Sequence, residues 1–379
     1  MCVGNRRRHK PRAAVRKVGD AVTWERFPYI DDYEEQVEDR FDFGLKYALV
    51  ELSMGACSIS NLPAGLLNDL HLLERLHLWG NLLETLPRGL FRHNGKLVEL
   101  LLWGNHIDEL GAAAFEGLRG LRRLDLDRNR LTVLPAAAVA RLASLRALRL
   151  ADNRIHAVAS DSFTALSGLR ALHLDGNGIA YVYPRAFRGL GNLSVLELDR
   201  NAVHFLPDDV FVDLGRLTDL RLADNQVEHV WARTFRGLRS LHRLRLTSNR
   251  LANLPNGAFG DSPALRHVQL DGNRLQVIGR CALASAAVGP ATAGLPRRSR
   301  LTLTLDANPL RCDCRMMWLL DVVGSTDLRV SGTCWTDAET PTPGGIMAAL
   351  QETRESCTEF AAAKDSVYCL SSNNTARQI

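Results

Sequence analysis

Apolar and polar positions along this chain follow a frame that repeats every 24 residues. The frame reads L-x-x-L-x-L-x-x-N, as in the stretch from Leu73 to Asn81. Its last position recurs without a slip at Asn81, Asn105, Asn129, Asn153, Asn177, Asn201, Asn225, Asn249 and Asn273. The frame continues one turn earlier, where it ends at Cys57, and one turn later, where it ends at Asn308. A fixed period of this length predicts stacked repeats, here about eleven turns.

Each fixed position of the frame has a physical role. The L-x-L segment predicts a short strand whose leucines point inward while the intervening residues point to the opposite face. A single turn cannot bury its leucines, so the turns stack into one parallel sheet. The asparagine carries both a donor and an acceptor and can satisfy buried backbone groups where the chain leaves the strand. We therefore predict an α/β repeat, a right-handed leucine-rich-repeat solenoid of horseshoe shape with a parallel sheet on its concave side. Cys57 falls in the asparagine column, and we interpret it as a buried free thiol.

The other half of each turn is equally regular. A phenylalanine follows the asparagine by ten residues in most turns, which predicts a stacked structural column, with Val139 as the exception. The column contains Phe91, Phe115, Phe163, Phe187, Phe211, Phe235 and Phe259. The register breaks once, between Asn273 and Asn308, where an insertion from Ala282 to Pro296 is rich in Ala, Gly and Pro. Its low complexity favours a flexible loop over a contact site.

Charge is concentrated at the beginning of the chain. The formal net charge is +5, but residues 1–17 hold seven basic residues and no acidic one, so the remainder is close to neutral. A near-neutral body does not indicate a nucleic-acid-binding protein. We predict a basic disordered tail over 1–18, an atypical N-terminal cap segment over 19–48, the solenoid over 49–309, a cysteine-rich cap over 310–360 and a tail over 361–379. No apolar run reaches the ~20 residues of a membrane-spanning helix, and no signal-peptide pattern opens the chain.

After the last turn comes the motif N-P-L-R-C-D-C, residues 308–314, followed by single cysteines at 334 and 357. With this motif the chain resembles the extracellular leucine-rich-repeat proteins that carry a cysteine-flanked C-terminal cap, such as Slit, the Nogo receptors, chondroadherin and the Toll-type ectodomains. The resemblance covers roughly residues 46–360 and implies disulfides Cys312–Cys334 and Cys314–Cys357. It also implies a short cap helix over 316–323, with Trp318 packed on the last turn. A zinc site built from the same cysteines is the alternative, although the spacing lacks a C-x-x-C or histidine pair.

Two disulfides imply an oxidising compartment. Because no leader or N-terminal cysteine cap accompanies them, we interpret the chain as part of a longer secreted or membrane-anchored protein with a truncated or misannotated start; an intracellular protein is the alternative. Cys281 with Cys369 is a possible third bridge, and Cys2 is unassigned. Asn192 and Asn373 begin N-glycosylation sequons, which support secretion only weakly.

Function is expected on the outward strand positions, because no catalytic motif, cofactor fingerprint or metal-ligand spacing is present. Stacking turns these positions into one continuous surface for a partner. Its candidate residues are His77, Trp79, Leu101, Trp103, Asp125, Asp127, Arg149, His173, Asp175, Glu197, Asp199, Arg221 and Arg245. Trp79 and Trp103 occupy one column on adjacent turns, and tryptophan is enriched in binding hot spots. A second interpretation is that residues 19–48 fold back and cover both rings.

The charged residues of this surface also allow two interpretations. Arginines and carboxylates on neighbouring strands can neutralise one another, or they can select a charged protein or glycosaminoglycan. We predict a non-catalytic protein-recognition module, the ligand-binding ectodomain of a secreted, matrix or cell-surface protein. The alternatives are an intracellular scaffold and the recognition part of a larger signalling receptor or matrix enzyme.

Overall fold

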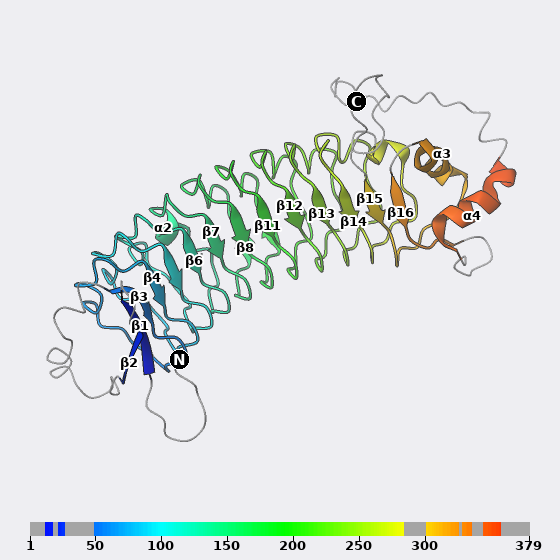
Figure 1. The fold of residues 1–379 in the computed structure, drawn as a ribbon. Helices are drawn as coiled ribbons and strands as arrows, with labels where there is room; N and C mark the ends of the chain where they lie inside the picture. Colours follow the sequence, from blue (N-terminus) through cyan, green and yellow to red (C-terminus); the bar gives the residue numbers. More distant parts are fainter. Residues whose placement is uncertain are drawn as a thin grey trace, which may run out of the picture. The chain divides into compact units, whose positions relative to one another are not determined.

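The chain folds into two compact units. The computed structural model describes residues 12–17, 22–26, 49–283, 301–325, 328–335 and 344–357. Unit 1 comprises Met1–His156 and Ser162–Gly178, and unit 2 comprises Ala157–Asp161 and Ile179–Ile379. Both units consist of short turns whose strands lie in register (Figure 1).

Unit 1 contains a parallel sheet with one strand from each turn. Its strands are β3 (Leu49–Ser53), β4 (Arg75–His77), β5 (Glu99–Leu101), β6 (Arg123–Asp125), β7 (Ala147–Arg149) and β9 (Ala171–His173). Leu52, Leu76 and Leu100 pair directly, and the same register continues through the unit. The rest of each turn is irregular, apart from the short helix α2 (Ala136–Val139). The 24-residue frame thus sets both the turn and its register.

An antiparallel hairpin covers the edge of this sheet. Strand β1 (Arg12–Lys17) pairs with β2 (Val22–Arg26) and, on its other side, with β3, where Val15 lies opposite Leu52. An unpaired strand edge exposes backbone groups, and the hairpin satisfies those of β3. The predicted disordered tail over 1–18 is therefore wrong for residues 12–17, which form a strand.

Unit 2 continues the same architecture. Its parallel strands are β11 (Val195–Glu197), β12 (Asp219–Arg221), β13 (Arg243–Arg245), β14 (His267–Gln269), β15 (Thr302–Thr304) and β16 (Arg329–Ser331). The last of these belongs to the cysteine-rich cap. A second small parallel sheet joins β8 (Ala157–Val158) to β10 (Tyr181–Val182), and bridges extend it through Phe205 to His229. With six repeat turns in unit 1 and five in unit 2 before the cap, the predicted solenoid of about eleven turns is confirmed.

The interior is built from the frame leucines and the asparagine ladder. Leu76, Leu100 and Leu124 are fully buried. The amide of Asn105 shows what the ladder does: its Nδ2 donates to the carbonyls of Leu78 and Leu102, and its Oδ1 accepts from the Leu83 N–H at 3.2 Å. Each amide thus ties its own turn to the preceding one, as the sequence predicts.

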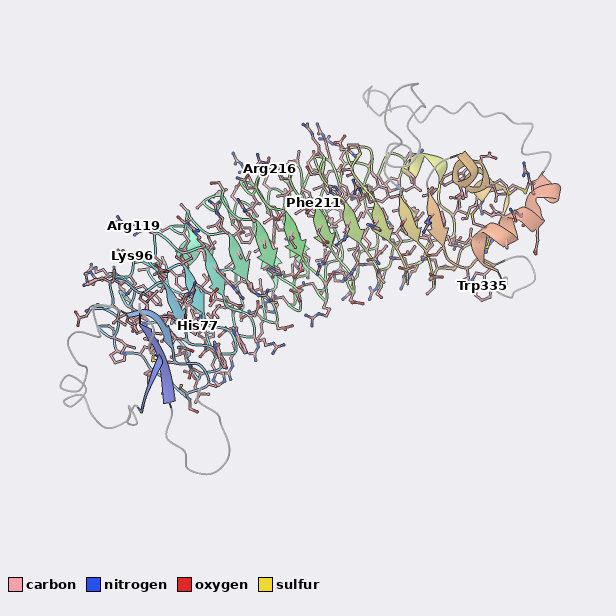
Figure 2. The ribbon with its side chains drawn as sticks, in the orientation of Figure 1. His77, Lys96, Arg119, Phe211, Arg216 and Trp335 are labelled. Carbon is pink, nitrogen blue, oxygen red and sulfur yellow. A yellow bond between two sulfur atoms is a disulfide. The ribbon has the colours of Figure 1, made fainter. Side chains whose placement is uncertain are left out.

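The phenylalanine column also forms as predicted. All seven rings are at most 2% exposed, and Val139 fills the remaining position. Within unit 2, Phe211 stacks on Phe187 at a centroid distance of 5.7 Å and on Phe235 at 6.3 Å. Figure 2 labels Phe211, whose side chain is fully buried. The column is therefore a packing element and not a ligand site.

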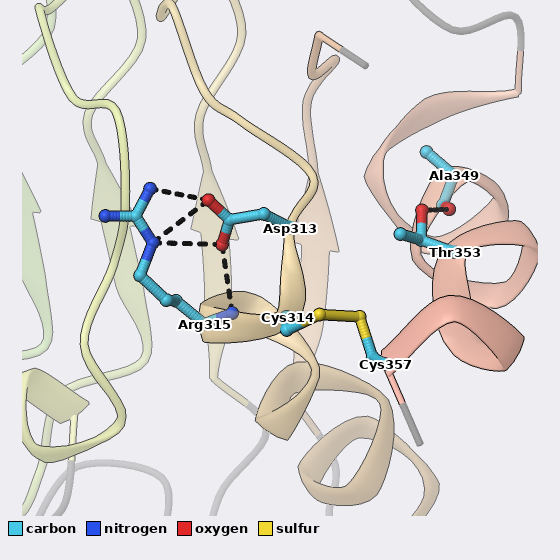
Figure 3. Close-up of a disulfide and its surroundings, with 6 residues drawn as sticks. All are labelled: Asp313, Cys314, Arg315, Ala349, Thr353 and Cys357. Atoms are coloured by element: carbon cyan, nitrogen blue, oxygen red, sulfur yellow. Dashed lines mark hydrogen bonds and ion pairs between the residues drawn. A yellow bond between two sulfur atoms is a disulfide. The ribbon is translucent and has the colours of Figure 1, made fainter. Parts of the chain in front are cut away.

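Two disulfides tie the C-terminal cap together. They join Cys312 to Cys334 and Cys314 to Cys357, the pairs that the resemblance implies. The cap contains 3-10 helix η2 (Cys314–Met316), helices α3 (Trp318–Ser325) and α4 (Gly345–Thr353) and 3-10 helix η3 (Arg354–Cys357). In Figure 3 the Cys314–Cys357 bridge links the beginning of η2 to the end of the cap.

The cap is also fixed to the repeats and to itself by hydrogen bonds. The Trp318 Nε1–H donates to the Ile278 carbonyl of the last regular turn at 3.0 Å. Asp313 accepts from the backbone N–H and the guanidinium of Arg315 (Figure 3), and this hydrogen bonding lowers the pKa of the Asp313 carboxyl. The cap therefore seals the leucines of the last turn.

The interpretation of Cys57 as a free thiol is wrong. Its sulfur is in a disulfide whose partner lies outside the described part of the chain. The Cys57 backbone N–H donates to Asn81 Oδ1 at 2.9 Å, so the ladder needs only its backbone. Because no earlier repeat turn requires its side chain, the sulfur is available for a bridge.

Three predictions fall outside the described residues. They are the Cys281–Cys369 bridge, of which only the Cys281 backbone is described, in 3-10 helix η1 (Arg280–Leu283); most of the insertion ending at Pro296; and the tail over 361–379. None of the helices in the described ranges combines the length and apolar character that crossing a membrane requires.

Candidate functional site

Two indole rings form the most distinctive feature on the open face of unit 1. Trp79 follows β4 and Trp103 follows β5, each in the first outward position after the strand. Their ring centroids lie 5.1 Å apart and their planes differ by 3°. Both side chains are half-buried, so one edge of the stack faces outward. Stacked aromatic pairs gain about 0.5–1.5 kcal/mol beyond the area they bury.

Gly55 provides the space that the Trp79 ring occupies in the stack. It occupies the same column one turn before Trp79, and a Cβ added to it would lie 2.4 Å from Trp79 Cε2. The Trp79 ring therefore rests on the backbone of Gly55 on one face and on Trp103 on the other. Any larger residue at position 55 would push the ring out of the stack.

Polar side chains beside the stack are already paired. His77 Nε2 lies 3.0 Å from Glu99 Oε1, and Arg123 Nη1 lies 3.4 Å from Glu99 Oε2. Leu101, half-buried, takes the outward place between His77 and Asp125. This arrangement gives an apolar centre with a polar, self-satisfied margin, which resembles the anatomy of a protein interface.

On the next turns the face becomes a charged network. Arg149 Nε lies 2.7 Å from Asp127 Oδ2 and 3.4 Å from the buried Asp125. Asp127 Oδ1 also accepts from the Ala151 N–H at 2.6 Å. Further along unit 1, His173 and Asp175 are half-buried on the turn of β9. The structure thus places the predicted unit 1 residues on one face, with the tryptophans and the charges in separate patches.

Burial raises the pKa of the Asp127 carboxyl and the charge of Asp125 raises it further, against the lowering effect of Arg149 and the Ala151 N–H. The folded state therefore holds the Asp127 proton more tightly than the unfolded chain does. This contribution to stability is present at low pH and is lost as pH rises through the raised pKa.

We expect Asp127→Asn, which cannot ionise, to gain stability relative to the wild type as pH rises above the ordinary aspartate pKa of about 3.9 and through the raised pKa of Asp127. Urea unfolding at several pH values measures this difference. The exposed Asp208→Asn is the matched control and is expected to show a flatter difference. If the stability of Asp127→Asn relative to the wild type instead falls with rising pH, the ion pair with Arg149 affects the carboxyl more strongly than burial does.

In unit 2 the predicted charged residues neutralise one another. Arg221 Nη1 lies 2.6 Å from Glu197 Oε1, and Arg245 Nη1 lies 3.9 Å from Asp199 Oδ2. Burial lowers the pKa of the Arg221 guanidinium, but hydrogen bonding to Asp219 and nearby carboxylates outweigh burial and raise it. Ion pairs near the surface are each worth at most about 1 kcal/mol. They favour the self-neutralised interpretation of this part of the face.

Asn192 is exposed just before β11, and its Oδ1 accepts from Arg216 Nη1. A glycan would be attached through Nδ2, and Oδ1 would remain an acceptor for Arg216. Asn373 lies outside the described residues.

Sequence reasoning missed an exposed aromatic surface in unit 2, made of Tyr181, Tyr183, Phe205 and Trp231. Their exposed fractions are 67%, 50%, 49% and 50%. Phe205 and Trp231 meet edge to face at 6.5 Å, and Tyr181 and Phe205 line a shallow pocket of about 290 Å³ with His204. The signal was available, because these residues stand four or six positions after a ladder asparagine. Their exposure could not be known without the coordinates.

A family model described as "Leucine rich repeat" matches residues 95–155, 144–203, 192–251 and 239–285, which together take in half of the chain. None of the curated proteins matches the chain significantly in sequence.

Solved structures share its fold. The crystal structure of a TLR13–ssRNA13 complex is similar at 21% identity and a TM-score of 0.55, over 75% of this chain and 51% of that one. The Toll–Spatzle complex from Drosophila is similar at 24% identity and a TM-score of 0.60, over 77% of this chain and 44% of that one. The chain thus spans about half the length of these two proteins. The repeat frame, the asparagine ladder and the family match agree, and the chain belongs to the leucine-rich repeat family.

Proposed function

We propose that this chain is a non-catalytic protein-recognition module and that it binds a protein ligand on the open face of unit 1, over the Trp79–Trp103 stack. The stack carries the proposal, because it presents a rigid apolar surface inside a margin whose charges are satisfied. Rigid aromatic anchors with such margins dominate the energetics of protein interfaces. The two solved structures described above are both ligand complexes, one with an ssRNA and one of Toll with Spatzle.

The same module is proposed to work outside the cell, as part of a secreted, matrix or cell-surface receptor or adhesion protein. Its support is the cap, where two disulfides close around η2 and α4, because such bridges persist in oxidising compartments. Mass mapping of the protein from its native source tests this: bridged Cys312 and Cys314 support it, and reduced cysteines favour an intracellular scaffold.

The ligand-binding test uses the whole chain against an array of extracellular protein domains. For a partner found there, Trp79→Ala with Trp103→Ala is expected to weaken binding by more than about tenfold, since buried tryptophan anchors contribute about 2 kcal/mol or more each. Surface plasmon resonance gives the affinities, and circular dichroism shows whether the variant is folded.

The matched control is Tyr183→Ala with Trp231→Ala, which removes two exposed aromatic rings from unit 2. It is expected to leave the affinity unchanged. The opposite pattern, with the unit 2 variant impaired and the unit 1 variant intact, would move the ligand site to the aromatic surface of unit 2.

A further inference from the structure

Three arginines form a ladder along the N-terminal ends of the strands in the sheet of unit 1. Arg122, Arg146 and Arg170 each stand directly before a strand, β6, β7 and β9 respectively. The Arg170 N–H donates to the Arg146 carbonyl at 2.8 Å, and the Arg146 N–H donates to the Arg122 carbonyl at 2.8 Å. These bonds place the residues on directly adjacent turns. All three side chains are exposed.

Two further cations stand shortly before the strands of this region, Arg119 on the turn of Arg122 and Lys96 on the preceding turn. Lys96 and Arg119 lie on neighbouring turns, since a Cβ on Gly120 would meet the Gly95 carbonyl oxygen at 2.8 Å. In Figure 2 they lie next to one another on the upper edge, away from His77. We name the basic edge as Lys96, Arg119, Arg122, Arg146 and Arg170.

Most cations of the basic edge are not neutralised by a carboxylate. Within the ranges that the structure describes, no carboxylate forms an ion pair with Lys96, Arg119, Arg122 or Arg146. The nearby Glu99 and Glu116 are taken by Arg123 and Arg141. Arg146 does hydrogen-bond the Gly168 carbonyl, which fixes its side chain without neutralising it.

Like charges on adjacent strands destabilise a sheet. Adjacent parallel strands lie about 4.8 Å apart, so the ladder anchors its arginine side chains at close, regular spacing along the backbone. Guanidinium forks bind oxyanions bidentately, and a row of them suits a linear polyanion with closely spaced charges.

We infer that the basic edge is a binding site for a linear sulfated polysaccharide. The segments that carry it, residues 92–98, 116–123, 140–147 and 164–171, contain no Phe, Tyr or Trp. Binding of single-stranded nucleic acid relies on such rings to stack the bases, so their absence favours a polyanion without bases. A protein partner would need an apolar anchor, which these segments also do not present. The site lies on a different edge from the tryptophan stack and is independent of the proposed protein ligand.

The test measures binding of a heparin-derived dodecasaccharide to the whole chain by isothermal calorimetry at several salt concentrations. Arg122→Gln with Arg146→Gln is expected to weaken binding at least about tenfold. It is also expected to reduce the slope of log Kd against log salt by about 2, since each arginine that engages an oxyanion accounts for about one unit of that slope. The desulfated oligosaccharide is expected not to bind.

The matched control is Arg185→Gln with Arg188→Gln, which makes the same change in net charge. Both arginines are exposed in unit 2 and paired with Asp161. This variant is expected to bind like the wild type. An equal loss of affinity in both variants would show that binding depends only on net charge, and it would overturn the proposed site. An RNA oligonucleotide that binds as tightly and is equally sensitive to the ladder variant would overturn the assignment to a polysaccharide.

Discussion

Replacing Asn153 by alanine is expected to lower the free energy of unfolding of unit 1 by about 3–5 kcal/mol. The Asn153 Nδ2 donates to the carbonyls of Leu126 at 2.9 Å and Leu150 at 3.1 Å, and its Oδ1 accepts from the Leu131 N–H at 3.1 Å. Alanine would leave these buried groups without partners, and each such group costs about 1–3 kcal/mol. Urea unfolding followed by circular dichroism measures the loss.

Two further variants identify the cause. Asn153→Asp keeps the acceptor for the Leu131 N–H but turns a carboxylate oxygen toward two carbonyls, so it is expected to be at least as damaging as alanine. Asn253→Ala removes an exposed asparagine from another turn and is expected to change stability by less than about 0.5 kcal/mol. If Asn153→Ala were as mild as Asn253→Ala, the ladder would not hold adjacent turns together.

The interior turns could be predicted because the frame assigns each residue to a column before any coordinates are known. Asn105 and Asn153 stand in one column, and each donates to two leucine carbonyls at equivalent positions. The phenylalanines likewise follow from their fixed offset. In a stack of equivalent turns, neighbours in space are residues 24 positions apart in sequence, so local pattern and tertiary contact carry the same information.

The ends of the repeats could not be predicted in this way, because they have a neighbour on one side only. At position 57 no earlier repeat turn needs a side-chain donor, so the column rule that made Cys57 a free thiol does not apply. The pairing of β1 with β3 and of β16 with β15 also depends on residues outside the frame. Caps are atypical for this physical reason.

The candidate site was predictable in position but not in geometry. The frame places Trp79 beside Trp103, but their near-parallel stacking also needs Gly55. A search of the outward columns for large side chains does not detect a glycine. Arg122 and Arg123 look alike in sequence, yet only Arg123 reaches Glu99. Which cation is neutralised depends on side-chain direction at the beginning of the strand, and a repeat frame does not specify this.

The second large effect is expected in unit 2, where Phe211→Ala should lower the free energy of unfolding by about 3–5 kcal/mol. The Phe211 ring is fully buried between Phe187 and Phe235. Its removal loses the transfer free energy of the ring and leaves a cavity that the two neighbouring rings, held by their own turns, can only partly fill. Urea unfolding gives the total loss, and hydrogen exchange locates it.

The chain offers a matched control six residues earlier, because Phe205 is 49% exposed on the same turn. Phe205→Ala is expected to cost less than about 1 kcal/mol, since it leaves no cavity. Phe211→Val, which copies the residue that fills this column at Val139, should fall between the two. Since each turn contacts only its neighbours, exchange should accelerate first in the turns of Phe187, Phe211 and Phe235. Equal losses for Phe211→Ala and Phe205→Ala would show that the stacked column does not stabilise the repeats.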